Sequence, residues 1–176
     1  SSLYTYNGIE CLHLNFNKYL NKGKYNLIRK SRDVFDLEFF TGLKELSILM
    51  LGDIELDENT IINLNTCENL ESLWISDNRA NDLRFSEISQ LANLKNLGIG
   101  LRDESDLSFV NLTSQSIVNL NINARNLKTV DLPHLAFLPA LEKLEIESKG
   151  LKAFNFGDFQ ESFNIKGLIL KTDSLT

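Results

Sequence analysis

The sequence predicts an α/β solenoid, in which each coil consists of one strand and one segment that returns to the next strand. Branched aliphatic residues occupy the first, fourth and sixth positions of a short segment, and this spacing occurs seven times. Successive starts lie 34, 27, 24, 23, 24 and 24 residues apart, a period typical of such coils. The seven triplets are Ile9/Leu12/Leu14, Leu43/Leu46/Ile48, Leu70/Leu73/Ile75, Leu94/Leu97/Ile99, Ile117/Leu120/Ile122, Leu141/Leu144/Ile146 and Ile165/Leu168/Leu170.

These triplets resemble the leucine-rich repeat superfamily, whose pattern is L-x-x-L-x-L-x-x-N-x-L. Asn17 and Asn78 supply the asparagine of the ninth position in the first and third repeats. The other repeats have Leu51, Arg102, Arg125, Lys149 and Asp173 there. The resemblance covers the chain from Ile9 onward. It implies a curved parallel β-sheet on the concave face and, as in bacterial internalin-like surface or effector proteins, a scaffold for protein interaction.

We expect one domain over residues 1–176, with repeats starting near residues 9, 43, 70, 94, 117, 141 and 165. A chain of this length with 43% hydrophobic residues can bury a continuous core. The interval 18–42 is longer than a repeat, and residues 18–32 include six lysines and arginines without an acidic residue. This basic run is either a solvated face or a docking patch for an acidic partner.

The returning segments contain regularly spaced apolar residues, such as Leu83, Phe85 and Ile88 after the third strand. This spacing predicts short helical or 3₁₀ turns mixed with extended pieces on the convex face. The leucine at the fourth pattern position, which is the middle residue of each triplet, should point inward and be almost fully buried. These residues are Leu12, Leu46, Leu73, Leu97, Leu120, Leu144 and Leu168.

Composition narrows the function class. The formal net charge of −6 argues against a general nucleic-acid binder, whose surface would be basic. The sequence contains no run of 18 apolar residues, which a membrane span would need, and its N-terminus lacks the layout of a signal peptide. The compartment therefore stays open between cytoplasmic and secreted or surface locations.

Catalytic and cofactor signatures are missing from the sequence. The two histidines, His13 and His134, lie far apart, and neither belongs to a cluster with the spacing of metal ligands. No glycine-rich phosphate loop occurs either. We therefore expect a protein that is not an enzyme and that has no cofactor and no metal site.

Side chains alternate between the two faces of a strand, so the second, third, fifth, seventh and eighth pattern positions should reach the concave face. The second positions alternate in charge between most neighbouring strands, which predicts ion pairs across the sheet. These residues are Glu10, Lys44, Glu71, Lys95, Val118, Glu142 and Lys166.

The candidate partner site combines apolar residues in the first half of the concave face with polar residues farther along. An exposed apolar patch often marks a partner site, and tryptophan is enriched among interface anchors. The candidate residues are Phe16, Leu49, Met50, Trp74, Leu101, Asn121 and Glu145.

We interpret this face as a non-enzymatic protein-protein interaction surface for a protein or peptide ligand. Two alternatives stay open: a structural spacer within a larger surface or effector protein, and a glycan-binding surface module. In the spacer, Trp74 and Met50 would only cover the core of neighbouring strands, whereas in a protein binder both would be presented to solvent.

The last repeat ends at Thr176 and leaves the strand edge 166–171 without a following coil. Solenoids need caps for solubility, and an unpaired edge invites pairing with another chain. The sequence therefore predicts either a cut from a longer protein or self-association through the C-terminal end.

Overall fold

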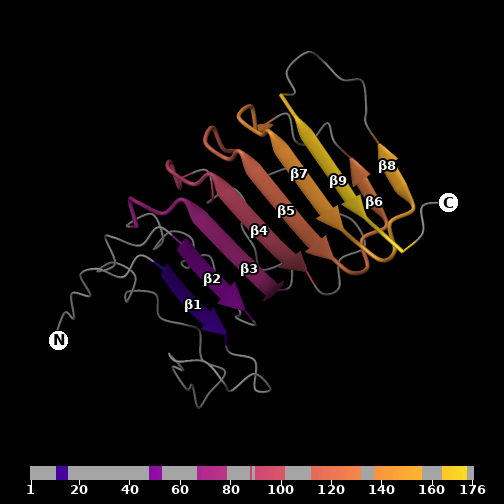
Figure 1. Cartoon of the computed structure of the whole chain (residues 1–176), viewed down its shortest axis with the longest axis horizontal. Coiled ribbons are helices and arrows are strands. Elements are labelled where there is room, and N and C mark those ends of the chain that lie inside the picture. Colours follow the sequence, from indigo (N-terminus) through magenta and orange to yellow (C-terminus); the bar gives the residue numbers. More distant parts are fainter. Residues whose placement is uncertain are drawn as a thin grey trace.

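The computed structural model describes residues 11–15, 48–52, 67–78, 88, 90–101, 112–131, 137–155 and 164–173. Seven strands form one parallel sheet in the order β1-β2-β3-β4-β5-β7-β9 (Figure 1). They are β1 (Cys11–Asn15), β2 (Ile48–Gly52), β3 (Ser72–Asn78), β4 (Asn96–Leu101), β5 (Asn119–Ala124), β7 (Lys143–Glu147) and β9 (Gly167–Lys171). Parallel strands that follow one another in chain order confirm the predicted solenoid.

A second, two-stranded parallel sheet pairs β6 (Thr129–Asp131) with β8 (Ala153–Asn155). Both strands lie in returning segments, and Figure 1 draws them at the same end of the molecule as β9. Val130 is buried and pairs with Phe154, which packs against the core. The expected mixture of extended pieces with short helical or 3₁₀ turns is thus found in the described parts of the returning segments, where β6 and β8 are extended, Ile88 is helical and Phe137 lies in a 3₁₀ turn.

Strand pairing corrects the start of the second repeat. Leu49 and Leu51 pair with Leu73 and Ile75 of β3, so the second triplet is Leu46/Leu49/Leu51 rather than Leu43/Leu46/Ile48. The repeat begins at residue 46, and the five later starts, at 70, 94, 117, 141 and 165, then follow at intervals of 23 or 24 residues.

The inward column forms the centre of the core. Leu73, Leu97, Leu120 and Leu144 are at most 1% exposed, as predicted. Leu168 occupies the same column in β9 but is 38% exposed, which contradicts its predicted burial. It belongs to the terminal strand of the sheet, where the next coil that would cover it is missing from the described residues.

The eighth pattern position also points into the core, which corrects a second expectation. Leu101 is 4% exposed, Ala124 is fully buried and Ser148 is 1% exposed. Ser148 has a structural role there, because its hydroxyl donates to the carbonyl oxygen of Leu127 at 2.8 Å and accepts from the amide of Gly150 at 3.3 Å. A serine thus ties two neighbouring turns together in a repeat that lacks the ninth-position asparagine.

Within the described residues, we find no helix with the length and apolar character needed to cross a membrane.

Candidate binding face of the large sheet

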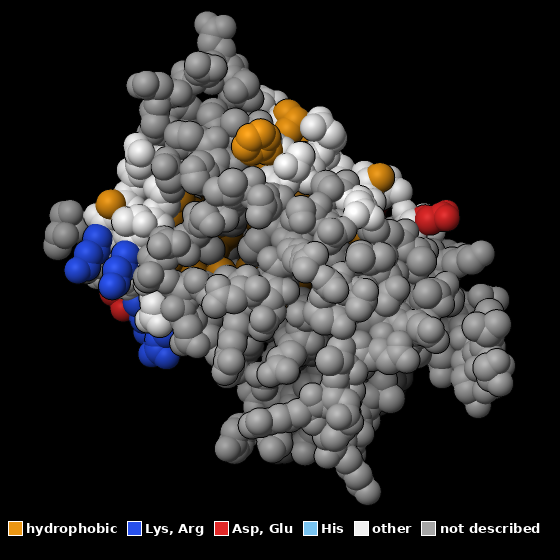
Figure 2. Space-filling view, turned by 180° about the vertical axis from the view of Figure 1, so that it is seen from behind, with side chains coloured by type: hydrophobic (Ala, Val, Ile, Leu, Met, Phe, Trp, Pro, Cys, Tyr) orange, Lys and Arg blue, Asp and Glu red, His pale blue; other side chains and the backbone are white. Residues whose placement is uncertain are grey.

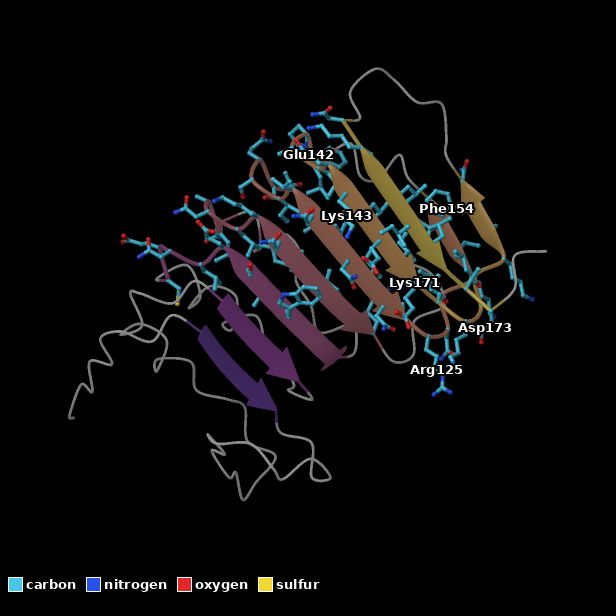
Figure 3. All side chains as sticks on the ribbon, in the orientation of Figure 1. Arg125, Glu142, Lys143, Phe154, Lys171 and Asp173 are labelled. Carbon is cyan, nitrogen blue, oxygen red and sulfur yellow. The ribbon has the colours of Figure 1, made fainter. Side chains whose placement is uncertain are left out.

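The concave face is the side of the seven-stranded sheet that points away from the core. In β5 the outward residues Asn119, Asn121 and Asn123 alternate with the buried Leu120 and Ile122. The same alternation sets the outward positions of β7, where Lys143 and Glu147 are exposed and Glu145 is half-buried. Figure 3 shows this face with its side chains. The third, fifth and seventh positions are therefore outward in these strands, as predicted.

Trp74 of β3 lies across the neighbouring strand rather than projecting straight into solvent. A Cβ atom at Gly98 of β4 would lie 2.5 Å from Cζ3 and 2.6 Å from Cδ2 of the indole, distances that no real side chain tolerates. The glycine therefore provides the space in which the indole rests on the backbone of the sheet. Trp74 is still 39% exposed, so one part of the ring remains available for contact.

A row of polar side chains crosses the sheet beside this tryptophan. Asn119 donates from Nδ2 to Oδ1 of Asn96 at 2.7 Å, and Asn96 donates from Nδ2 to Oγ of Ser72 at 2.9 Å. The amide ladder, defined as Ser72, Asn96 and Asn119, joins β3, β4 and β5. Because these groups satisfy one another, the ladder fixes the surface beside Trp74 and leaves fewer polar groups to be desolvated by a ligand.

Beyond β5 the concave face becomes ionic. Glu145 of β7 accepts from Nζ of Lys171 at 2.6 Å and lies 3.5 Å from Nζ of Lys143. The hydrogen bond from Lys171 is the main cause that lowers the pKa of Glu145. Desolvation opposes it, and the charges of Lys171 and Lys143 lower the pKa further. The same hydrogen bond raises the pKa of Lys171. Glu145 is thus an ionised, internally paired carboxylate.

The predicted ion pairs of the second pattern position are present where the structure describes both partners. Lys95 bonds to Glu71 at 2.9 Å, and Lys166 bonds to Glu142 at 2.6 Å. Val118 interrupts the series between them. The pairs are exposed, so each adds little stability, but both support the strand register.

Positive charge also gathers outside the concave face. The turns after β5 and β7 contain the exposed cations Arg125, Lys128, Lys149 and Lys152. Figure 2, viewed from behind, shows lysine and arginine side chains gathered at the C-terminal end of the molecule. These turns follow directly from the ends of the strands and so lie along one edge of the sheet. We call the four residues the basic rim. A ligand on the sheet would therefore meet positive charge at this rim.

Comparison with known proteins finds a structural neighbour. No protein-family model and no curated protein sequence matches the chain. Among solved structures, the chain is similar to the crystal structure of internalin C2 from Listeria monocytogenes, with 25% identity and a TM-score of 0.50. The chain has an internalin-like leucine-rich repeat fold. The match covers 75% of this chain and 54% of internalin C2, so the chain spans about half the length of that neighbour.

Only some of the seven predicted site residues belong to one column of the concave face. Trp74, Asn121 and Glu145 share the fifth-position column of the concave face, together with Gly98. Met50 pairs in register with Trp74 and so belongs to the same column of the sheet. Leu49 pairs in register with Leu73, which puts it at the fourth pattern position rather than the seventh, and its side chain is not among those described. Leu101 is buried in the core, which contradicts its predicted place on the surface, and Phe16 lies outside the described residues.

Two features of this face were not recognised from sequence. The amide ladder could have been found, because Ser72, Asn96 and Asn119 share the third pattern position in successive repeats. Gly98 was also visible as a glycine within a strand, which often marks the close approach of another group. Within the described residues, we find no group of three His, Cys, Asp or Glu side chains arranged to hold a metal ion.

Proposed function

We propose that the chain is a non-enzymatic protein-interaction module that binds a polypeptide on the concave face. The likeness to internalin C2 supports an interaction module in general terms. The observation that carries the specific proposal is the indole of Trp74, held against Gly98 and 39% exposed. An aromatic ring that is already fixed loses little conformational freedom on binding, which favours it as an interface anchor.

The surroundings of Trp74 define the chemistry of the ligand. The anchor position suits an apolar or aromatic side chain, because the ring offers an open apolar surface. Asn121 and Asn123 lie on the same face of β5 and can hydrogen-bond to the backbone of an extended peptide. The basic rim attracts acidic residues toward the end of the strands and mainly increases the rate of association. We infer a peptide with an apolar anchor and an acidic flank.

The exposure of Trp74 favours this function over a spacer, in which the tryptophan would only cover core. A glycan could also stack on an indole flanked by asparagines, so the experiment must separate peptide from glycan. Peptides and glycans would both contact this ring. Each class therefore needs its own binding assay.

The experiment is a selection from a displayed peptide library and, in parallel, binding to a glycan array. Trp74 is the single tryptophan of the chain, so its fluorescence reports directly on occupancy of the site. We expect selected peptides to shift this emission and to lose about 2 kcal/mol, or roughly thirtyfold in affinity, on Trp74→Ala. Phe137→Ala, which truncates an apolar residue that is 53% exposed in a returning segment, is the matched control and should not change affinity.

A set of peptides that binds Trp74→Ala as tightly as the original chain, while circular dichroism shows both folded, would overturn the anchor assignment. Binding of glycans alone, lost on Trp74→Ala, would replace the peptide ligand with a carbohydrate. Absence of binding in both selections would favour the spacer.

A further inference from the structure

The middle of the concave face is an uncharged surface along β4 and β5. The outward residues of these strands are Asn96, Gly98 and Gly100 in β4 and Asn119, Asn121 and Asn123 in β5. The indole of Trp74 covers Gly98, whereas Gly100 leaves the backbone of β4 without an outward side chain beside Asn123. We call Gly98, Gly100, Asn121 and Asn123 the central lane. It continues from the indole toward the C-terminal ends of the strands.

The amides of the central lane differ from those of the amide ladder. Asn119 bonds to Asn96, whereas within the described residues we find no hydrogen-bond partner for the side chains of Asn121 and Asn123. Each of these amides can donate to and accept from a peptide backbone. The two residues lie about 7 Å apart along β5, which is also the distance between alternate residues of an extended peptide. Together they can hold one extended segment that runs along the strand.

Negative charge borders the central lane on the side of β7. Glu145 and Glu147 pair in register with Asn121 and Asn123. Glu145 is paired with Lys171, whereas Glu147 is exposed at the end of β7. An acidic ligand residue at the level of Asn123 would lie beside Glu147 and be repelled. An acidic part of the ligand therefore has to bind elsewhere.

A cation lies where the central lane ends. Arg125 is exposed in the turn directly after β5, and Figure 3 shows it past the C-terminal ends of the strands. The hydroxyl of Ser148 in the next coil donates to the carbonyl oxygen of Leu127 at 2.8 Å, which ties this turn to its neighbour. Lys149 occupies the pattern position of Arg125 in that coil, and the coil after it has Asp173 there. Two neighbouring cations can thus bind one carboxylate at this end of the lane.

We propose that the concave face binds an extended peptide that runs along β5, with an apolar side chain against Trp74 and an acidic side chain four residues away against Arg125. The six-membered ring of the indole lies over Gly98, which pairs in register with Asn121. Arg125 follows Asn121 by four residues, and an extended ligand advances by the same distance per residue as the strand beneath it, about 3.3 Å. Because this assignment rests on the proposed peptide function, it adds only the course of the peptide, the spacing and the residue that binds the acid.

Charge complementarity favours this course over one across the strands. A peptide that crossed the sheet from Trp74 would pass Asn121 and reach Glu145, the next residue of the same column. The lysine that bonds to Glu145, Lys171, is already engaged within the protein. A peptide along β5 instead leaves both glutamates to one side and brings its acidic residue to Arg125.

Selection from a displayed peptide library tests the spacing. The library fixes one central phenylalanine as the anchor and randomises the residues on both sides, so it reports an acidic preference at any distance. We expect aspartate or glutamate to be enriched four residues from the phenylalanine. An amide side chain bonds to a peptide group in either chain direction, so the side on which the acid is enriched gives the direction of the peptide.

Arg125→Glu is the decisive variant. Selection on it should replace the acidic preference at this spacing with lysine or arginine, and peptides selected on the original chain should bind it about tenfold more weakly. Lys128→Glu is the matched control, because it makes the same change of charge at an exposed residue directly before β6 of the second sheet. It should change affinity less than about threefold and preserve the spacing. Asn123→Ala should weaken binding about fivefold through the loss of one amide of the lane.

Failure of this assignment differs from failure of the proposed function. Selected peptides could need Trp74 but show no acidic preference at four residues, or could respond equally to Arg125→Glu and Lys128→Glu while circular dichroism shows both variants folded. Either result would overturn the course along β5 and leave the peptide function in place. A selection that yields no peptide dependent on Trp74 would refute both.

Discussion

The interior coils around β3, β4 and β5 and the terminal coils around β7 and β9 use the same pattern positions for different interactions. In the interior coils the third position forms the amide ladder and the fifth position holds Trp74 against Gly98. In β7 the charged residues Lys143 and Glu145 occupy these two positions, and Glu145 pairs with Lys143 and with Lys171 of β9. The inward leucines differ as well, because Leu97 is 1% exposed and Leu168 is 38% exposed. Residues at the same pattern position therefore contribute differently to the stability of the fold, according to the number of neighbouring coils that cover them.

The largest difference should appear in the inward column. Leu97→Ala removes a buried side chain between two coils and should lower the free energy of unfolding by about 2–5 kcal/mol through lost burial and a cavity. Leu168→Ala removes a partly exposed side chain, so its cost should be about 1 kcal/mol in the monomer. Urea denaturation of both variants at low protein concentration provides the measurement. Equal losses would show that the terminal coil is as well covered as the interior.

The contact between Trp74 and Gly98 should produce the next largest effect. Gly98→Ala forces the indole off the sheet, so we expect red-shifted tryptophan emission and a loss of about 1 kcal/mol in stability from the disrupted packing. Gly167→Ala is the matched control, because its Cβ would lie 3.6 Å from Cγ of Lys143, an ordinary contact distance. Unchanged emission in Gly98→Ala would contradict the position of the ring on the glycine.

The amide ladder should contribute less than the core but more than an isolated surface residue. Asn96→Ala removes both of its hydrogen bonds and leaves Asn119 without its acceptor, at a cost of about 1–2 kcal/mol. Asn123→Ala changes an exposed asparagine on the same face and should cost less than about 0.5 kcal/mol. Thermal unfolding of the two variants compares them, and equal midpoints would deny the ladder any structural role.

The sequence determined the positions of the strands better than the identity of the surface residues. The aliphatic spacing predicts the inward column because a misplaced leucine would have to leave the core. For the second repeat, however, Leu43/Leu46/Ile48 and Leu46/Leu49/Leu51 fit the same pattern, and the regular interval of 23 or 24 residues selects the second. The pattern alone could not separate them, because each consists of correctly spaced aliphatic residues.

The candidate site was harder to predict for a different reason. Alternation within a strand puts Leu101 in the core with Leu97 and Ile99, although the strand was expected to turn outward at its end. The position of Trp74 on Gly98 depends on a contact between two repeats, which spacing within one repeat does not contain. The spacing of residues within one coil therefore determines which side chains enter the core. The arrangement of the surface side chains depends on contacts between neighbouring coils.

The smallest predicted effect is ionic and is confined to the terminal coils. The lowered pKa of Glu145 stabilises the folded chain above the pKa of the unfolded carboxyl, and this contribution is lost as the pH falls through the folded pKa. The raised pKa of Lys171 stabilises the fold below the unfolded lysine pKa and is lost as the pH rises through the folded value. Both contributions are therefore present between these limits, but solvent screening keeps them small.

NMR titration can detect this ionic interaction directly, without the need for a measurable change in stability. We expect the carboxyl of Glu145 to titrate below the ordinary range of glutamate and to move back toward it in Lys171→Met, because the lysine hydrogen bond is the main cause of the shift. Lys166→Met provides the control, since that lysine pairs with Glu142 instead. Added salt should reduce the shift of Glu145 in the original chain, whereas the neutral amide ladder should not respond. A Glu145 pKa that is unaffected by Lys171→Met would remove the basis for distinguishing ionic terminal coils from amide-linked interior coils.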